Sequence, residues 1–218
     1  RLGAFVITLP ESQNSLKASV LYHRLVLGEQ RGSIDRDRFL KYLSLPNNRS
    51  IVAKSWVEKN RQRTPVQLNA DYQPLVLLQP IRDDSQLIES YLTHFFKSDE
   101  NVDSFASLVE RDYLEEVFAT TKILYGLGDP KRHYAKLSPE KQKSLQSRVE
   151  VKFAPTNKPV YNNKESVSLS VVLKNTPDVL LKVYRLNARN ILLQSNEGIH
   201  TGIDLDGLVP NAERKLTY

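Results

Sequence analysis

The spacing of apolar residues changes once along the chain, near Arg148. Before that point apolar residues recur at every third or fourth position, most clearly over 87–96 and 105–125, which is the spacing of one helix face. From Arg148 onward apolar and polar residues alternate, which is the spacing of a half-buried strand. The change predicts an α+β protein, with an α-rich domain over 1–147 and a complete or partial antiparallel β-sandwich-like domain over 148–218.

Start and stop signals divide the first region into helices. Ser, Thr, Asp and Asn cap the amino-terminal ends of helices, and Gly or Pro follows their carboxyl-terminal ends. These signals predict the following helices: one from Ser33 or Asp35 to a stop before Pro46, one over Ser50–Arg63, one from Asp84 or Ser85 through Lys97, one from Asp103 to Gly126, and one that starts at Ser138-Pro139-Glu140 and ends near Ser147.

A few strands are also predicted near the amino-terminal end. Ala4–Ile7 is a short apolar run, and Ala18–Leu27 places apolar side chains on both sets of alternating positions. The pattern over Val66–Pro80 is ambiguous. Its apolar run, Tyr72–Pro80, is bounded by prolines, so we expect a short extended segment there rather than a helix.

The second region shows strands and turns at intervals of roughly ten residues, which suits an antiparallel sandwich. Residues 154–164 contain prolines and asparagines and are predicted to form a loop, and Asn175-Thr-Pro-Asp178 is predicted to be a turn. The predicted strands cover 148–153, 167–173, 179–186 and 191–193.

One series of motifs in this region carries a family resemblance. It consists of the lead-in Pro159-Val-Tyr161, the polar turn Asn162-Asn163, an alternating strand over 167–173 and the run Lys182-Val-Tyr184. The series resembles the opening of a macroglobulin-like β-sandwich domain, the module of α2-macroglobulin and complement-type proteins. The resemblance implies an architectural module with an exported, periplasmic or cell-surface location. The thioester of that family needs a Cys, and this chain has none, so no reactive bond is implied.

Composition narrows the classes of function. Apolar residues make up 40% of the 218 residues and charged residues 26%, which suits packed cores rather than disorder. No run approaches the roughly 20 apolar residues of a membrane-spanning helix, so no transmembrane segment is predicted. The absence of Cys excludes disulfides, thiolate nucleophiles and Cys-based metal sites. The chain begins at Arg1 without Met, and we interpret it as an internal piece of a larger multidomain protein.

The net charge is +6, and the densest basic run lies between residues 54 and 63. A basic run with an aromatic side chain can bind nucleic acid or another polyanion. The interpretation that we favour is a solvated helix face with Trp56 turned into the core. The candidate polyanion-binding residues are Lys54, Lys59, Arg61 and Arg63.

Neither the histidines nor the acidic residues form a recognisable catalytic or metal site, and no cofactor is predicted. No two of His23, His94, His133 and His200 have the spacing of a metal-ligand pair, although His133 could contact an anion. The carboxylates of Glu110, Asp112, Glu115 and Glu116 cluster on one predicted helix, where we expect most of them to face water.

The sequence Asp204-Leu-Asp206-Gly207 resembles the start of a calcium-binding loop. Such a loop needs a Glu at its twelfth position, and Lys215 occupies that position in this chain. We therefore predict a turn at Asp206-Gly207 instead of a metal site.

Three hypotheses of function follow from these patterns. The preferred one is a non-catalytic structural or protein-interaction module, whose partners are other domains of the same polypeptide or other proteins. The second is a nucleic-acid or polyanion binder that uses its basic surface. The third is part of an enzyme whose remaining site lies outside this chain, with Glu115 or Glu116 in a cleft.

Overall fold

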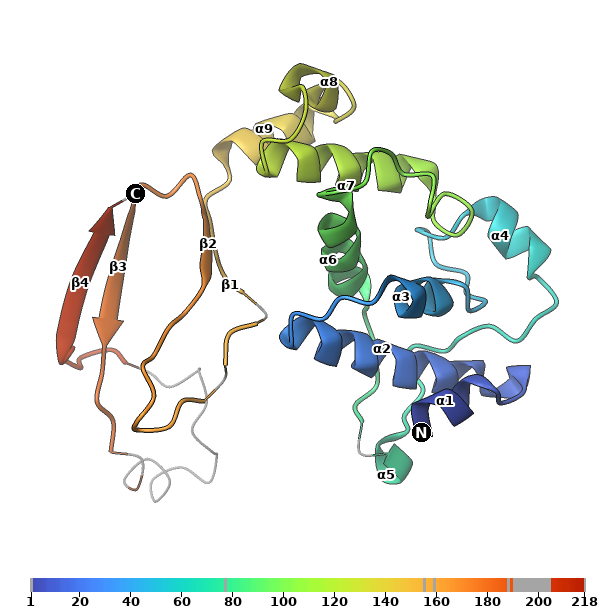
Figure 1. Ribbon diagram of the computed structural model, residues 1–218, viewed down its shortest axis with the longest axis horizontal. Coiled ribbons are helices and arrows are strands. Elements are labelled where there is room, and N and C mark those ends of the chain that lie inside the picture. Colours follow the sequence, from blue (N-terminus) through green and yellow to red (C-terminus); the bar gives the residue numbers. More distant parts are fainter. Residues whose placement is uncertain are drawn as a thin grey trace. The chain divides into compact units, whose positions relative to one another are not determined.

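The computed structural model describes residues 2–76, 78–154, 156–158, 160–187, 189 and 205–217. The chain forms two compact units, one of Arg1–Ser147 with Phe153–Val171 and the other of Arg148–Lys152 with Val172–Tyr218. The first unit is helical and the second contains strands (Figure 1). The fold is α+β, as the sequence predicts.

The helical unit is built from short and medium-length helices. Its elements are α1 (Leu2–Ile7), the 3-10 turn η1 (Glu11–Gln13), α2 (Asn14–Gln30), α3 (Arg36–Leu43), α4 (Lys54–Lys59), α5 (Gln73–Val76), α6 (Ser85–Phe96), α7 (Arg111–Leu124), α8 (Pro130–Tyr134) and α9 (Pro139–Ser147). Every described helix is too short or too polar to cross a membrane.

Aromatic rings form the centre of the helical unit, where α2, α3, α6 and α7 meet (Figure 1). Phe39 of α3 stacks on Tyr91 of α6, with 5.0 Å between ring centroids, and lies 5.9 Å from Phe105. Phe96 of α6 meets Phe118 of α7 edge to face at 5.2 Å, so the same cluster joins these two helices.

A polar cluster is buried beside this core. The Asp84 carboxylate, 2% exposed, precedes α6 and accepts hydrogen bonds from the Tyr42 hydroxyl and the Arg49 guanidinium. Arg49 also donates to Asn47 Oδ1 over 3.0 Å. Burial and the neighbouring Asp84 charge raise the pKa of the Tyr42 hydroxyl, so that it stays protonated as a donor. The cluster ties α3, the following loop and the start of α6 together.

Several predicted helices are confirmed, together with their capping residues. Asp35 caps α3, and its side chain accepts from the Arg38 amide over 2.9 Å. Helix α6 spans Ser85–Phe96. Gly126 follows α7 with φ of 63°, a left-handed conformation in which Gly is not strained. Ser138 Oγ accepts from the Lys141 amide in the first turn of α9.

The strands predicted near the amino-terminal end are wrong, because Ala4–Ile7 lies in α1 and Ala18–Leu27 in α2. The buried residues of α2 include Ala18, Leu21, Leu25 and Gly28, which lie three or four positions apart. Apolar residues occupy both sets of alternating positions in this segment, so its sequence also fits the two-residue period of a strand. The buried residues, however, recur at the helical period.

Two predicted helices are shorter than expected. Asp103 starts no helix, since α7 begins only at Arg111, and α4 covers Lys54–Lys59 instead of Ser50–Arg63. An antiparallel bridge between Val52 and Val109 explains why both helices start late. Ala53 and Glu110, the residues directly before α4 and α7, have ψ of 128° and 132°, which is extended backbone, so neither helix begins before them.

The prediction of a short extended segment in Tyr72–Pro80 is wrong at α5, a helix over Gln73–Val76. Pro74 lies in the first turn of this helix, where the chain needs no amide donor.

The strand region contains two pairs of strands among the described residues. Strand β1 (Glu150–Phe153) pairs with β2 (Val171–Lys174), and β3 (Asp178–Val183) pairs with β4 (Ala212–Thr217). The predicted strand over 167–173 therefore begins only at Val171. Strand β4 was not predicted, and the strand predicted over 191–193 lies outside the described residues. The turn predicted at Asp206-Gly207 is present, with φ of 80° at Gly207.

The antiparallel pair β3–β4 has two different faces. In its register Leu181 is opposite Arg214 and Lys182 is opposite Glu213, so alternate residues share a face. The face with Lys182 is mostly polar, although it also carries Leu180, and on it the Lys215 ammonium lies 2.8 Å from the Asp178 carboxylate. The other face carries Val179, Leu181, Val183 and Leu216, of which Leu181 and Val183 are about half exposed.

Candidate interaction surface

The basic residues selected from the sequence lie on α4 and in the turn that follows it. Arg63 pairs with Glu11 over 2.6 Å, and Arg61 faces Glu58 at 3.9 Å on a highly exposed surface. Lys54 and Lys59 are exposed. Acidic side chains therefore neutralise both arginines in part. No ion pair is found for Lys54 or Lys59 among the described residues, so the charge of these two lysines stays uncompensated.

Trp56 does not provide a platform for stacking bases. Its side chain is partly buried and packs against the core, as we favoured from the sequence. Two hollows lie next to α4 among the described residues. One has a volume of about 40 Å³ and is too small for a nucleobase. The other has a volume of about 650 Å³ and is lined by Glu58, Lys59, Arg61, Gln62 and Arg63, so its size does not argue against polyanion binding.

A second basic region lies where α7 ends and α8 begins. We call it the α7–α8 corner and define it by Lys97, Lys122, Leu124, Tyr125 and Lys131. The Lys97 ammonium lies 4.1 Å from the centroid of the Tyr125 ring, a cation–π distance. Lys122 Nζ donates to the backbone oxygen of Lys97 over 3.5 Å. Both lysines follow or end a helix, where the helix dipole favours positive charge.

The local sequence explains how α8 is positioned at this corner. Gly126 and Gly128 have φ of 63° and 75°, which lets the chain turn sharply after α7. Asp129 then caps α8 by accepting from the Lys131 amide over 3.0 Å, and Pro130 occupies the first helical position. Lys131 is thereby presented to solvent from the first turn of α8.

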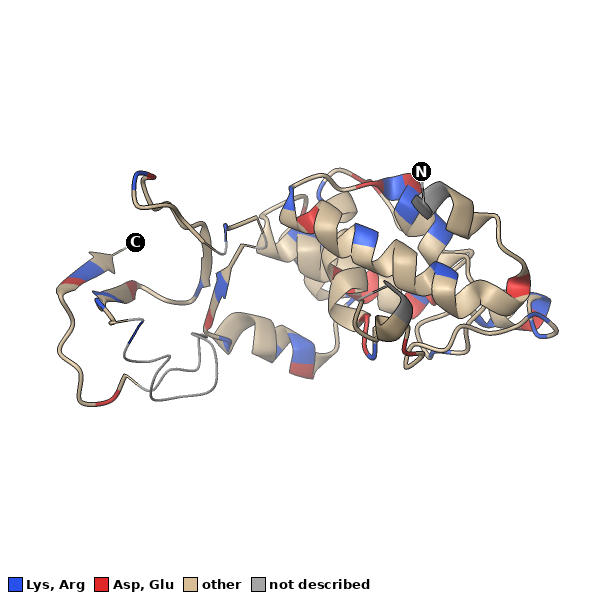
Figure 2. Cartoon of the chain, turned by 90° about the horizontal axis from the view of Figure 1, so that it is seen from below, with Lys and Arg blue, Asp and Glu red and all other residues tan. Residues whose placement is uncertain are grey.

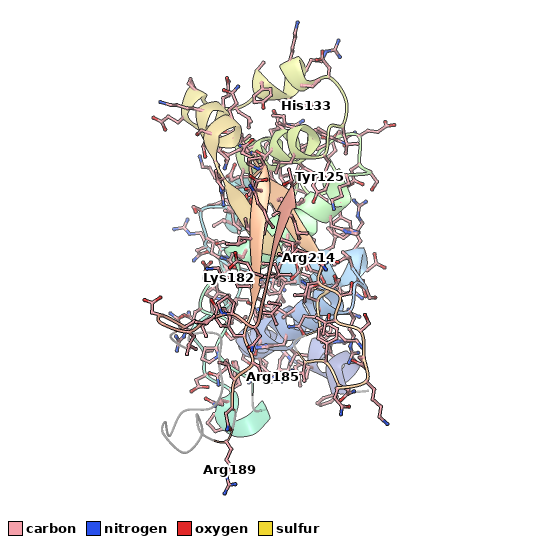
Figure 3. The ribbon with its side chains drawn as sticks, turned by 90° about the vertical axis from the view of Figure 1, so that its left-hand side faces the viewer. Tyr125, His133, Lys182, Arg185, Arg189 and Arg214 are labelled. Atoms are coloured by element: carbon pink, nitrogen blue, oxygen red, sulfur yellow. The ribbon has the colours of Figure 1, made fainter. Side chains whose placement is uncertain are left out.

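His133 anchors α8 to α7. Its ring meets Phe118 edge to face with 5.9 Å between centroids (Figure 3 labels His133 and Tyr125). Burial, followed by the charges of Lys122 and Lys136, lowers the pKa of the His133 imidazole. The ring is therefore neutral near pH 7, and the positive charge of the corner comes from its lysines. Anion binding by His133 stays a prediction.

The lysines of the α7–α8 corner differ from their neighbours in pairing. Arg132 pairs with Asp129 over 3.7 Å, and Lys136 pairs with Glu115 over 3.3 Å. Within the described part of the chain, the ammonium groups of Lys97, Lys122 and Lys131 have no acidic partner. Their charge is available to a binding partner.

The two carboxylates considered for catalysis are held in surface ion pairs. Partial burial opposes a charge on Glu115, but hydrogen bonds from Lys136 and Arg111 outweigh it and lower the pKa of its carboxyl group. Glu116 lies 2.7 Å from the Lys141 ammonium. A general acid needs a raised pKa, so the geometry of this pair does not favour acid–base chemistry.

The remaining histidines have structural contacts or lie outside the described residues. His23 Nδ1 lies 2.8 Å from the Ser19 oxygen, and His94 meets Phe95 edge to face at 5.5 Å. His200 and Asp204 are not described. Across the described residues, no group of three or more His, Asp or Glu side chains could hold a metal ion.

Cations also lie on β3, after it and on β4. Figure 3 labels Lys182 of β3, Arg185 and Arg189 after β3, and Arg214 of β4. Lys182 is 4.0 Å from Glu213, and the Arg185 amide donates to Asn211 Oδ1. In the helical unit, Figure 2 shows basic and acidic residues interspersed over the surface. Positive charge alone therefore does not distinguish the α7–α8 corner from the rest of the surface. The corner differs because its unpaired lysines accompany exposed apolar side chains.

Sequence reasoning did not find this corner, although it noted His133 and the basic residues beside it. Lys97 and Lys122 are far apart in the chain, and only the packing of α6 against α7 brings them together. The signals available in the sequence were a lysine near the end of each helix and the aromatic Tyr125 directly before Gly126-Leu-Gly128.

Comparisons with known proteins give a consistent result. The family model described as the Actin-binding protein F N-terminal domain matches residues 1–149, and the model of the AbpF first immunoglobulin-like domain matches residues 179–218. Actin-binding protein F of Dictyostelium discoideum is 27% identical over 217 residues, which is 98% of this chain and 9% of that relative. No solved structure matches the chain. None of these comparisons bears on the macroglobulin-like resemblance, which stays a prediction.

Proposed function

We propose that this chain is a non-catalytic protein-interaction module whose partner is actin, because the chain belongs to the Actin-binding protein F N-terminal domain family. The observation that carries the proposal is the likeness to a protein named for actin binding, which extends over 98% of the chain. It replaces the unspecified protein partner expected from the sequence with one that can be tested.

The geometry of the helical unit supports an interaction role over a catalytic one. The carboxylates of Glu115 and Glu116 face cations at the surface instead of lining a cleft. The α7–α8 corner offers exposed side chains of the kinds that protein interfaces use, namely an aromatic ring with basic neighbours. The net charge of the whole chain, +6, favours an acidic partner.

The other hypotheses from the sequence stay separate from this proposal. Binding of nucleic acid through Lys54, Lys59, Arg61 and Arg63 is the alternative that salt-dependent binding to DNA, RNA or heparin would reveal. The exported, periplasmic or cell-surface location stays a prediction.

Co-sedimentation of residues 1–218 with actin filaments tests the proposal. We expect the chain to pellet with filaments in a saturable manner and to stay in the supernatant without them. Binding should weaken as salt rises, because the surface is basic. A chain that stays in the supernatant at low salt over a wide range of filament concentration would refute actin binding. Stronger binding to heparin than to filaments at equal salt would favour the polyanion hypothesis.

A further inference from the structure

We propose that the α7–α8 corner is the surface through which the helical unit docks onto an acidic protein, the actin filament. This inference rests on the proposed function and adds to it the location of the contact and its central residue, Tyr125. In this interface the Tyr125 ring and Leu124 form an apolar centre, and Lys97, Lys122 and Lys131 face carboxylates of the partner.

The first argument is the exposure of adjacent apolar side chains. Within the described part of 1–147, the exposed large hydrophobic residues are Phe5, Leu27, Leu124 and Tyr125. A single exposed apolar residue on a surface is ordinary and needs no explanation. Leu124 and Tyr125 are neighbours, and they are 45% and 47% exposed. Tyr is also among the residues that most often dominate the energy of protein interfaces.

The second argument is charge complementarity. The Lys97 ammonium lies over the Tyr125 ring, Lys122 precedes the apolar pair in α7, and Lys131 follows it in the first turn of α8. None of these three lysines has an acidic partner among the described residues. The run on α4 differs in two respects: its arginines face Glu11 and Glu58, and its one large aromatic ring packs against the core. Its lysines, Lys54 and Lys59, also have no acidic partner among the described residues, so the apolar pair is what distinguishes the α7–α8 corner. Uncompensated lysines next to exposed apolar area fit a partner with acidic residues around an apolar spot.

The third argument is preorganisation. The Tyr125 amide donates to the Thr121 oxygen over 3.0 Å, and the Lys97 ammonium lies over the Tyr125 ring. Lys122 is tethered to the Lys97 backbone and lies 5.1 Å from the centroid of the Phe118 ring. These contacts restrict the side chains before binding, so less conformational entropy is lost when a partner docks.

The test compares two charge-matched variants and one truncation, each in residues 1–218. Lys97→Gln with Lys131→Gln removes two positive charges from the α7–α8 corner, and Lys54→Gln with Lys59→Gln removes two from α4. Tyr125→Ala removes the apolar centre without changing charge. All three sites are exposed, so the variants should keep the circular dichroism spectrum and melting temperature of the parent chain.

Actin co-sedimentation should separate the variants. We expect Tyr125→Ala to raise the dissociation constant about tenfold or more, as truncation of a central interface aromatic does. The Lys97 and Lys131 double variant should raise it about three- to tenfold at low salt and less at high salt. The Lys54 and Lys59 double variant should change it less than about twofold.

The outcomes distinguish this inference from the proposed function. If the parent chain binds filaments and all three variants bind equally well, actin binding stands and the corner is refuted as its site. An equal loss in both lysine double variants would also refute it, since general electrostatics would then explain the binding. If the parent chain does not bind filaments, the proposed function fails. The α7–α8 corner is then tested as a docking site for acidic chains, by measuring binding of labelled poly-L-glutamate. If the Lys97 and Lys131 double variant binds poly-L-glutamate as well as the parent chain does, the corner is refuted as that site.

Discussion

Replacing Asp84 by Ala should destabilise the helical unit more than any exposed acidic substitution. The change leaves Arg49 and Tyr42 without the carboxylate that both contact. Breaking a buried ion pair by removing one partner typically costs about 3–5 kcal/mol. The Arg49 side chain is 22% exposed and can turn toward water, so we expect the lower part of that range, about 3 kcal/mol.

Urea unfolding followed by circular dichroism at 222 nm measures this loss. At about 2–4 °C per kcal/mol for a chain of this size, the melting temperature should also fall by roughly 6–12 °C. Glu100→Ala, at an exposed position, is the control and should change stability by less than about 0.5 kcal/mol. A double-mutant cycle with Arg49→Ala isolates the coupling between the two charges. A cost below about 1 kcal/mol for Asp84→Ala, with an unchanged denaturant slope, would refute the structural role given to this carboxylate.

Further variants test individual positions. Gly28→Ala should lower stability by about 1–3 kcal/mol in thermal melts, because its Cβ would lie 2.7 Å from the Ser33 backbone oxygen; an increase in stability would contradict that close contact. Asp35→Ala should cost about 1 kcal/mol in urea unfolding through loss of the bond to Arg38, whereas Asp35→Asn should keep most of it. The lowered pKa of His133 means that the unfolded chain binds protons more readily, so stability should fall as pH drops below about 6.5. His133→Gln should reduce the fall in melting temperature between pH 7.5 and 5.5, and an identical fall would contradict the assignment.

The sequence was sufficient for elements whose pattern fits only one period. The apolar residues of α6 recur at helical spacing with polar residues between them, and its start was identified correctly. The alternation after Arg148 likewise located β1 and β3. In α2 the pattern failed because Val20, Tyr22 and Val26 add apolar side chains outside the buried stripe, so two periods fitted equally well.

Features that depend on contacts between distant segments could not be predicted. The bridge between Val52 and Val109 shortens two helices at once, and nothing near either residue signals it. The α7–α8 corner depends in the same way on Lys97 reaching Tyr125 after α6 and α7 have packed. Strand β4 was missed because charged residues fill it, and its partner β3 stabilises it through pairs such as Lys215 with Asp178.

The two-faced ribbon of β3 and β4 has a practical consequence for handling this protein. A pair of strands that leaves Leu181 and Val183 about half in water is at the margin of independent stability, so it should open more often than the aromatic core. Trypsin would then cut first at Lys182 or Arg214, since both lie in this pair, and the product that resists digestion would be the helical body.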